Sequence, residues 1–414
     1  MRMKGGYLFP PVPRTDRMGD YLVLQYIPHK GPLAYVAAVW EAPALRTYPA
    51  AVRRLLLQLL AEDHLRYGPG GVHKALLELG WEWHWETTLD SLFLVARGLV
   101  EGFPRALELL YEAVAEPVLE GPTVRLEVER LAEAQRRAYA HLPYRAESYL
   151  AERLWGASYA VFEATPPETI ASLELASLKL YWEAFLCKGL RYLVVAAPGV
   201  PRAIYRWESL SGPLAYEIPL AARPLSVQRV EETAEAQQVS LRVAYPWVRP
   251  SAAQYGAYQL ALFRLGGYFG SLLMQNLREE AGLTYGVYAR ALSAQAAAYF
   301  VIAAEVDRHR IEEALHRIES EVRTWSENPF PSEEVFQEVQ RSLLLRLEVE
   351  GLSEWISRLA HLLGRGLSAA DYVAQMEAIA SYRWADWPRL SLPKEAQVTI
   401  AVGTPRPIFA GACA

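Results

Sequence analysis

The stretch GGYFGSLLMQNLREEAGLTYGVYA, residues 266–289, is the most informative part of this sequence. Its glycines and apolar residues predict a helix from Gly270 to Glu280, and Gly282 is placed to close that helix as a C-cap. A strand rich in tyrosine and valine is expected to begin at Tyr285, directly after the turn. A helix, a turn and a strand in so few residues are typical of an α+β layer.

Two polar side chains flank this turn, Arg278 near the end of the helix and Tyr285 at the start of the strand. A guanidinium and a phenol in these places could both donate hydrogen bonds to one carbonyl or oxyanion. An ordinary structural interpretation also stands, in which Arg278 neutralises carboxylates near the helix C-terminus and Tyr285 packs at the turn. The residues alone leave both interpretations open.

Outward from this stretch, the same order of elements occurs twice along the chain. The first half predicts strands at Tyr21–Ile27 and Ala34–Trp40, helices at Tyr48–Leu65 and Val72–Leu79, strands at Trp81–Thr87 and Ser91–Ala96, a helical run from Arg105 to Phe185, and a strand at Leu190–Ala196. The second half predicts a strand at Gln238–Tyr245, helices at Ala252–Arg264 and Gly270–Glu280, strands at Tyr285–Ala291 and Ala297–Glu305, helices at His309–Trp325 and Ser332–Glu348, and a strand at Gln397–Val402.

This repetition predicts a duplicated α+β protein whose two homologous halves cover residues 1–205 and 206–414. Each half is expected to form a mostly antiparallel sheet with helices on one face. An irregular linker rich in proline, roughly Val200–Pro224, would join the halves. One large α+β domain with chance similarity between its halves is the alternative.

The composition limits the class of protein. A chain of 414 residues exceeds a usual single domain, and a hydrophobic content of 52% is enough for a core. The net charge of −5 argues against a nucleic-acid-binding protein, and no apolar run is long enough for a transmembrane helix. Cys187 and Cys413 provide neither a disulfide framework nor a thiolate metal cluster. Since Met1–Pro10 does not resemble a secretory signal, we expect a cytoplasmic protein without a membrane partner.

The eight histidines do not form a recognisable metal-binding motif. No pair has the spacing of HExxH or HxxEH, which places two imidazoles on one helix face around Zn²⁺. His309 and His316 share a predicted helix face but lie two turns apart, so we expect them to face solvent. His84 lies between two tryptophans of a predicted strand and is expected to pack there with its imidazole hydrogen-bonded. The sequence therefore predicts no metal-binding residue in this chain.

The letters LRE at residues 277–279, followed by GLTY at residues 282–285, resemble the second-half motif of the insulinase, pitrilysin and mitochondrial-processing-peptidase family. That family has leucine-arginine-glutamate and then glycine-leucine-x-tyrosine, with the arginine and the tyrosine seven residues apart, as they are here. The repeated halves extend the resemblance over nearly the whole chain. The resemblance implies two α+β halves that form half of a clamshell around unfolded peptide.

The resemblance also implies roles for two residues. In this family an arginine and a tyrosine contact the substrate carbonyl at the scissile bond. The zinc ligands, HxxEH and a distal glutamate, come from the other half of the clamshell. By this resemblance Arg278 and Tyr285 would polarise the carbonyl and stabilise the tetrahedral intermediate.

The sequence departs from the family where the zinc ligands should be. The helix expected to carry HxxEH reads QLLAEDH at residues 58–64. If Glu62 is aligned with the motif glutamate, Leu59 and Asp63 occupy the histidine positions, and a shift by one residue places Gln58 and Glu62 there. Neither alignment gives two histidines. The glutamates on the helix that usually provides the third ligand are then expected on a solvated or ion-paired face: Glu127, Glu129 and Glu133.

Some members of the family divide the work between two related chains, one with HxxEH and one with the arginine–tyrosine pair. This sequence has the second pattern, so the resemblance implies the non-metal-binding subunit of a heterodimeric zinc metallopeptidase. Such a subunit is inactive alone and has no cofactor of its own. A paralogous subunit with HxxEH would supply Zn²⁺ and the glutamate base, and unfolded peptides would be the substrates. The alternatives are a catalytically inactive scaffold and a peptide-binding subunit.

Overall fold

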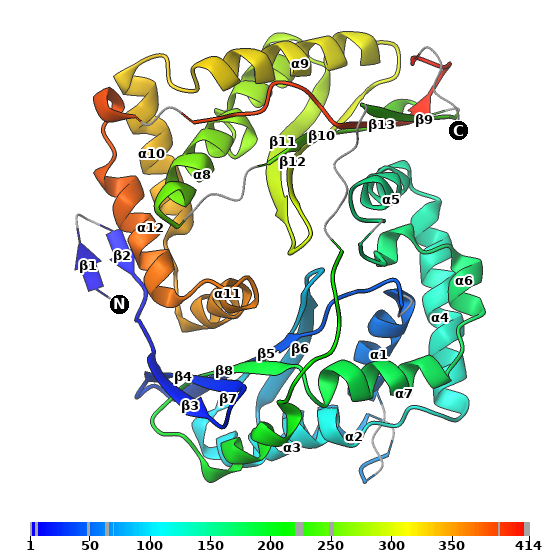
Figure 1. The fold of residues 1–414 in the computed structure, drawn as a ribbon, viewed down its shortest axis with the longest axis vertical. Helices are drawn as coiled ribbons and strands as arrows, with labels where there is room; N and C mark the ends of the chain where they lie inside the picture. The colour runs from blue at the N-terminus through cyan, green and yellow to red at the C-terminus, as the bar shows by residue number, and fades with distance from the viewer. Residues whose placement is uncertain are drawn as a thin grey trace. The chain divides into compact units, whose positions relative to one another are not determined.

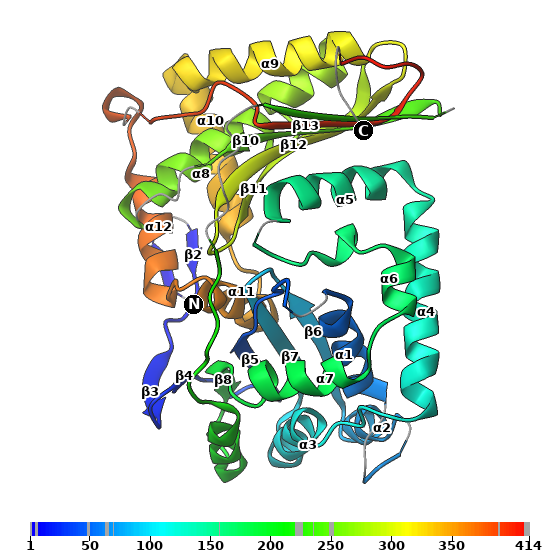
Figure 2. The same cartoon turned by 45° about the vertical axis from the view of Figure 1, so that its right-hand side comes forward.

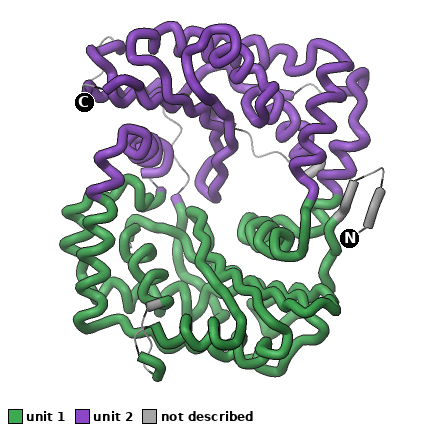
Figure 3. Tube along the Cα trace, turned by 180° about the vertical axis from the view of Figure 1, so that it is seen from behind, with its two compact units in different colours: residues 1–135, 159–218, 349–373 green, residues 136–158, 219–348, 374–414 purple. Residues whose placement is uncertain are grey.

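The structure is a computed structural model that describes residues 2–4, 7–47, 50–62, 66–68, 70–156, 158–219, 227–234, 236–247, 252–387 and 390–409. The chain divides into two compact units, coloured green and purple in Figure 3. Unit 1 consists of Met1–Gln135, Tyr159–Ile218 and Val349–Val373. Unit 2 consists of Arg136–Ser158, Pro219–Glu348 and Ala374–Ala414.

A six-stranded mixed sheet forms the centre of unit 1. Across the sheet the strands are β3 (Arg14–Met18), β4 (Leu22–Pro28), β8 (Leu190–Ala197), β5 (Leu33–Glu41), β7 (Ser91–Leu99) and β6 (Trp81–Thr87). The pair β4–β8 is parallel, and the other neighbouring pairs are antiparallel. Strands β5 and β8 are buried over most of their length, as expected where both faces of a sheet are covered. Two short strands, β1 (Arg2–Lys4) and β2 (Tyr7–Phe9), pair separately.

A five-stranded mixed sheet forms the centre of unit 2. Across this sheet the strands are β11 (Thr284–Ser293), β12 (Ala298–Asp307), β10 (Gln238–Pro246), β13 (Val398–Thr404) and β9 (Gln228–Thr233). The pair β9–β13 is parallel, and the other neighbouring pairs are antiparallel.

The two sheets follow one plan. In order, β4, β8, β5, β7 and β6 of unit 1 correspond to β9, β13, β10, β12 and β11 of unit 2, and the parallel pair has the same place in each. In both sheets the order ends on an edge strand, β6 in unit 1 and β11 in unit 2. The predicted α+β class with two homologous halves is therefore confirmed. The sequence analysis did not predict strands β3 and β9.

The helices of unit 1 cover its sheet, and each turns an apolar stripe toward the core. They are α1 (Ala50–Glu62), α2 (Gly71–Glu78), α3 (Phe103–Ala115), most of α4 (Pro122–Tyr139), α6 (Pro167–Ala171) and α7 (Ala176–Tyr181), with the short turns η1 (Val100–Gly102), η2 (Phe162–Ala164) and η3 (Trp182–Leu186). On α1, Leu55, Leu56 and Leu59 recur at helical spacing and are fully buried in one core cluster with Trp40 and Leu94.

Unit 2 contains longer helices with the same alternation of buried and exposed faces. They are α8 (Ala252–Gly266), α9 (Ile311–Glu327), α10 (Glu333–Leu347) and most of α12 (Ala369–Ser381), with the turn η6 (Trp384–Asp386). Ser332 caps α10, since its side chain accepts a hydrogen bond from the Val335 amide. In the described part of the chain, every helix is too short or too polar to cross a membrane.

Each sheet also carries one helix from the other half of the sequence. Helix α5 (Leu142–Trp155) packs on β10 and β13 of unit 2, and α11 (Leu352–Gly364) packs on β5, β7 and β8 of unit 1. Figure 2 shows α5 and α9 on opposite faces of the unit 2 sheet, and Figure 1 shows α11 against the unit 1 sheet. The compact units therefore differ from the predicted division into 1–205 and 206–414, because α5 and α11 bury their apolar faces on the sheet of the opposite half.

An ion-pair group fixes α5 to the unit 2 sheet. Arg242 on β10 has a side chain that is only 5% exposed. Its Nε donates to Glu147 on α5 at 2.8 Å, and its Nη1 donates to Glu305 on β12 at 3.1 Å. Although burial opposes it, these two carboxylates raise the pKa of Arg242. The guanidinium therefore stays charged and joins the exchanged helix to two strands.

The predicted linker Val200–Pro224 is not irregular throughout. It contains the 3₁₀ helix η4 (Arg202–Leu210), which buries Ile204, Trp207 and Leu210 in the core of unit 1. Apolar residues at every third position match the three residues per turn of a 3₁₀ helix. The end of the predicted linker, from residue 220, lies outside the described residues.

Candidate functional site

The candidate site is the helix–turn–strand segment of unit 2 that the sequence singled out. After α8 and a short loop, the chain forms the helical segment η5 (Met274–Glu280), which has π-type hydrogen bonding, and then enters β11. Gly266 is required at the end of α8, because a Cβ atom there would lie 2.6 Å from the backbone nitrogen of Ala289 on β11. Met274 and Leu277 are buried and hold η5 against the unit 2 core. Single π-turns are frequent at functional sites.

Gly282 closes η5 as predicted. Its φ is +60°, which glycine adopts without strain. The Gly282 amide donates to the Arg278 carbonyl at 3.1 Å, and the Leu283 amide donates to the Leu277 carbonyl at 2.8 Å. This pattern satisfies the last carbonyls of a helix and fixes the direction in which the chain leaves it.

A β-bulge places Tyr285 on the surface. Thr284 pairs with Val306, whereas Val287 pairs with Ala304, so β11 contains one residue more than β12 at this point. The Thr284 hydroxyl stabilises the bulge, since its Oγ1 lies 2.7 Å from the Glu305 carbonyl oxygen. The Tyr285 side chain is 87% exposed as a result.

Arg278 and Tyr285 both present unused hydrogen-bond donors. The Arg278 side chain is 38% exposed, and its Nε lies 3.4 Å from the carboxylate of the adjacent Glu279. The guanidinium carbon lies 4.9 Å from the centre of the Phe269 ring. Within the described residues, neither the terminal guanidinium nitrogens of Arg278 nor the hydroxyl of Tyr285 has a hydrogen-bond partner. The structure thus places both predicted residues on one segment without a contact between them, and Tyr285 does not pack at the turn.

The helix expected to carry zinc ligands has no pair of histidines. Leu59 on α1 is fully buried in the unit 1 core, and Gln58 has a buried side-chain oxygen without a partner. Asp63 and His64 lie outside the described residues, as does the side chain of Glu62. The hydrocarbon side chain of Leu59 cannot coordinate a metal ion, so residues 58–64 do not fit a zinc site of the HxxEH type. Among the described residues, no group of three or more histidine, cysteine, aspartate or glutamate side chains could hold a metal ion.

The other predicted acidic and histidine positions have ordinary surroundings. Glu127 on α4 is buried and pairs with Arg130, and the neighbouring Glu129 and Glu133 are exposed. His309 and His316 are exposed, as predicted. A contact that the sequence did not reveal joins α11 to the edge strand β6, where the Glu86 carboxylate binds His84 at 2.9 Å and also His361. Glu86 and His361 are 275 residues apart in the sequence, so no local motif could indicate their contact.

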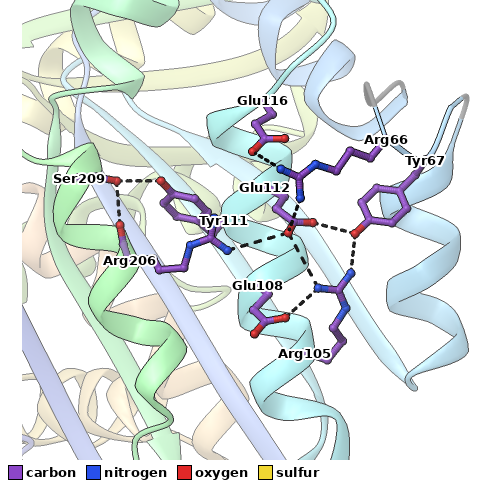
Figure 4. Close-up of polar contacts among 9 residues, drawn as sticks. All are labelled: Arg66, Tyr67, Arg105, Glu108, Tyr111, Glu112, Glu116, Arg206 and Ser209. Atoms are coloured by element: carbon purple, nitrogen blue, oxygen red, sulfur yellow. Dashed lines mark hydrogen bonds and ion pairs between the residues drawn. The ribbon is translucent and has the colours of Figure 1, made fainter.

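A second polar cluster lies in unit 1, where the segment after α1 meets α3 (Figure 4). The nearly buried Glu112 carboxylate accepts a hydrogen bond from the Tyr67 hydroxyl at 2.8 Å, and the Arg66 guanidinium lies at 3.4 Å. Arg105 and Arg206 approach the same carboxylate to 3.9 and 4.0 Å. Two further glutamates pair with these arginines, Glu108 on α3 with Arg105 and Glu116, just after α3, with Arg66. The cluster anchors the segment after α1 to α3 and η4, and it was not predicted because its arginines come from separate segments.

One family model matches part of the second half of the chain. Residues 205–343 match the family model described as the peptidase M16 inactive domain. The match begins at the predicted start of the second half and contains both Arg278 and Tyr285. None of the curated proteins matches the chain.

Solved structures of the same fold cover nearly the whole chain. The peptidase M16 inactive domain from Pseudomonas fluorescens is 19% identical, with a TM-score of 0.85 over 95% of this chain and 98% of that chain. A putative M16-like peptidase from Alicyclobacillus acidocaldarius is 17% identical, with a TM-score of 0.75 over 96% of this chain and 100% of that chain. The periplasmic protease PqqL from Escherichia coli is 14% identical, with a TM-score of 0.71 over 98% of this chain and 49% of that chain. At these identities the likeness establishes a shared fold.

Proposed function

Because residues 205–343 match the family model described as the peptidase M16 inactive domain, we propose that this chain is the non-metal-binding subunit of a two-chain zinc metallopeptidase. Arg278 and Tyr285 are its contribution to the shared active site. The single observation that carries the proposal is the pair of unused donors on the helix–turn–strand segment of unit 2. Exposed donors without a partner in their own fold are available to a ligand, as the proposed role requires.

Each donor has a distinct task in this proposal. The planar fork of Arg278 offers two parallel N–H groups to the carbonyl oxygen of the scissile bond. The Tyr285 hydroxyl donates to the same oxygen as negative charge develops on it. Both groups are set on a segment closed by Gly282 and the Thr284 bulge, so little reorganisation is needed when substrate binds.

The remaining parts of the active site belong to a paralogous HxxEH subunit. Its Zn²⁺ supplies a polarised water and its glutamate supplies the base, while this chain binds the carbonyl. The proposed compartment is the cytoplasm. Cell fractionation tests that assignment, because PqqL, a protein of the same fold, is described as periplasmic.

The first test assays each chain alone and the two chains mixed. The closest HxxEH paralogue from the same genome is co-expressed with this chain, and cleavage of a quenched fluorescent peptide library is measured together with zinc content. We expect activity in the mixture only, and zinc in the partner only, since Leu59 cannot act as a ligand. Zinc-dependent proteolysis by this chain alone would contradict the proposal.

The proposed substrates are unfolded peptides, bound in part through main-chain hydrogen bonds. Strand β11 carries Tyr285 and lies at the edge of its sheet, so one side of its backbone is not paired with another strand among the residues that the structure describes. An extended peptide can add to such an edge with little demand on its sequence.

We therefore expect an unfolded peptide to bind the two-chain complex and a compact native protein to fail as a competitor. Fluorescence anisotropy of a labelled peptide measures its binding and the competition by the native protein. The same peptide with alternate amides N-methylated is the matched control, because it cannot complete a ladder of hydrogen bonds and should bind at least tenfold more weakly. Equal competition by native protein, or equal binding of the methylated peptide, would count against strand addition.

The second candidate is an inactive scaffold or peptide-binding subunit, which the match to an inactive domain also favours. A scaffold requires a stable complex with its partner but makes no use of free donors. Stable association without peptide hydrolysis in the mixture would favour the scaffold. A homodimer that binds peptide without any partner would favour the peptide-binding subunit.

A further inference from the structure

Phe269 is an apolar side chain held on the surface beside the candidate site. It lies in the loop between α8 and η5 and is 65% exposed, whereas the large apolar residues around it are mostly buried. The Arg278 guanidinium carbon is 4.9 Å from the centre of its ring. That distance is within the range of a cation–π contact.

The loop that carries Phe269 is anchored from both sides. Arg264, nearly buried on α8, donates from Nη1 to the Gly270 carbonyl at 3.2 Å and lies 3.3 Å from the Tyr268 hydroxyl. The ring of Tyr268 stacks on Phe263 with a centroid distance of 5.0 Å. The residues on each side of Phe269 are therefore fixed, and its exposed ring is held in place by the loop.

Stacking leaves the donors of an arginine available. A ring contacts the face of the guanidinium, while the N–H groups lie in the guanidinium plane and point outward from its edges. A guanidinium that contacts Phe269 through its face can therefore still direct both terminal nitrogens at a ligand. Its present polar contact is the neighbouring Glu279 at 3.4 Å, and Glu280 follows directly in the sequence. Without the ring, these carboxylates would compete for the guanidinium.

We infer that Phe269 is a positioning residue that keeps the Arg278 fork free to meet the scissile carbonyl. The inference rests on the proposed function for its catalytic consequence, but the contact itself can be measured without activity. The matched variants are Phe269→Leu, which removes the ring, and Phe269→Tyr, which keeps it. Tyr205→Leu is the control, because Tyr205 is similarly exposed at 63% but lies on η4 in unit 1.

The first readout is the Nε–Hε resonance of Arg278 in ¹⁵N-arginine-labelled full-length chain, assigned by its loss in Arg278→Lys. Phe269→Leu is expected to remove the ring-current shift of this resonance and to increase its mobility, while Phe269→Tyr and Tyr205→Leu leave it in place. The second readout is peptide cleavage by the two-chain complex. Phe269→Leu should lower kcat about threefold to tenfold with little change in KM, and Phe269→Tyr should retain activity.

The outcomes separate this inference from the proposed function. If the resonance of Arg278 does not respond to Phe269→Leu, or if kcat is unchanged in an active complex, the positioning role is wrong. If the resonance responds but the wild-type mixture cleaves no peptide, Phe269 still positions Arg278 and the proposed peptidase function fails. Because Phe269 is exposed, the leucine variant should unfold at the wild-type temperature, and Phe269→Ile provides a second variant without the ring.

Discussion

Replacement of Arg278 by alanine is expected to lower kcat/KM of the proposed two-chain peptidase by about a hundredfold to a thousandfold, which is typical for the loss of one oxyanion donor. Tyr285→Phe removes only a hydroxyl and should lower kcat/KM by about tenfold to a hundredfold. The loss should fall mainly on kcat, because a donor aimed at developing charge contributes more in the transition state than in the bound substrate. Neither substitution should change folding, since both side chains extend from the surface.

Arg290 provides a matched control for Arg278. It lies on the same strand as Tyr285 and has a side chain that is 49% exposed, but its Nη2 already lies 3.4 Å from the Glu147 carboxylate. Arg290→Ala should therefore change kcat/KM by less than about threefold, as expected for an exposed ion pair. Association with the HxxEH subunit is measured by analytical ultracentrifugation for every variant. If Arg278→Ala and Arg290→Ala have the same activity in an intact complex, the catalytic role of Arg278 is wrong.

Much of the fold follows from local patterns in the sequence. Strand β6 lies at Trp81–Thr87, as predicted, because its residues alternate between core and surface. Strand β11 and the turn at Gly282 are also close to prediction, since only glycine accepts the positive φ found there without strain. The repeated order of elements predicted the common plan of the two sheets.

Other features depend on contacts that a single sequence does not show. Helix α5 has an apolar face, but nothing in its residues specifies that this face covers β10 and β13 rather than the sheet of its own half. The helical segment η5 packs on β11 and α9, and the bulge at Thr284 belongs to the pairing of β11 with β12. Helical spacing alone predicts an ordinary helix and strand here. At the candidate site, the motif indicated Arg278 and Tyr285, but the proposed role of Phe269 required knowledge that its ring is exposed and lies beside the Arg278 guanidinium.

The largest stability effect in the molecule is expected at Arg53 on α1. This arginine is buried in unit 1, and its terminal nitrogens donate to carbonyls at the end of β5 and in the turn between β6 and β7. The acceptors are the backbone oxygens of Ala42, Thr88, Leu89 and Ser91. Burial lowers the pKa of Arg53, although nearby groups, including Tyr181 and Asp90, oppose the shift. One side chain thus donates to four main-chain acceptors that have limited access to water. Three of these carbonyls also accept a second hydrogen bond, from the Tyr181 hydroxyl, the Ala44 amide and the Thr88 amide.

Arg53→Met keeps most of the volume but removes the donor to the Thr88 carbonyl, which has no other among the described residues, and takes one of two donors from each of the other three carbonyls. We expect it to lower the free energy of unfolding of unit 1 by about 3–5 kcal/mol, the cost of breaking a buried charged group's contacts. For a unit of this size, that is a decrease in melting temperature of roughly 10 °C. Arg53→Lys, which keeps the charge but offers fewer and differently placed donors, should be intermediate. Differential scanning calorimetry of the full-length chain measures the melting temperatures of the wild type and of both variants.

Arg54 is the matched control, because it is the next residue on the same helix but is exposed, with its guanidinium 5.7 Å from the centre of the Phe162 ring. Arg54→Met removes the same number of donors and should cost less than about 1 kcal/mol, since an exposed cation–π contact is weak. The difference between the two variants isolates the carbonyl network from any general effect of losing a positive charge on α1. Equal melting temperatures for Arg53→Met and Arg54→Met would mean that water or a rearranged backbone satisfies the four carbonyls, and that Arg53 does not hold this end of the sheet together.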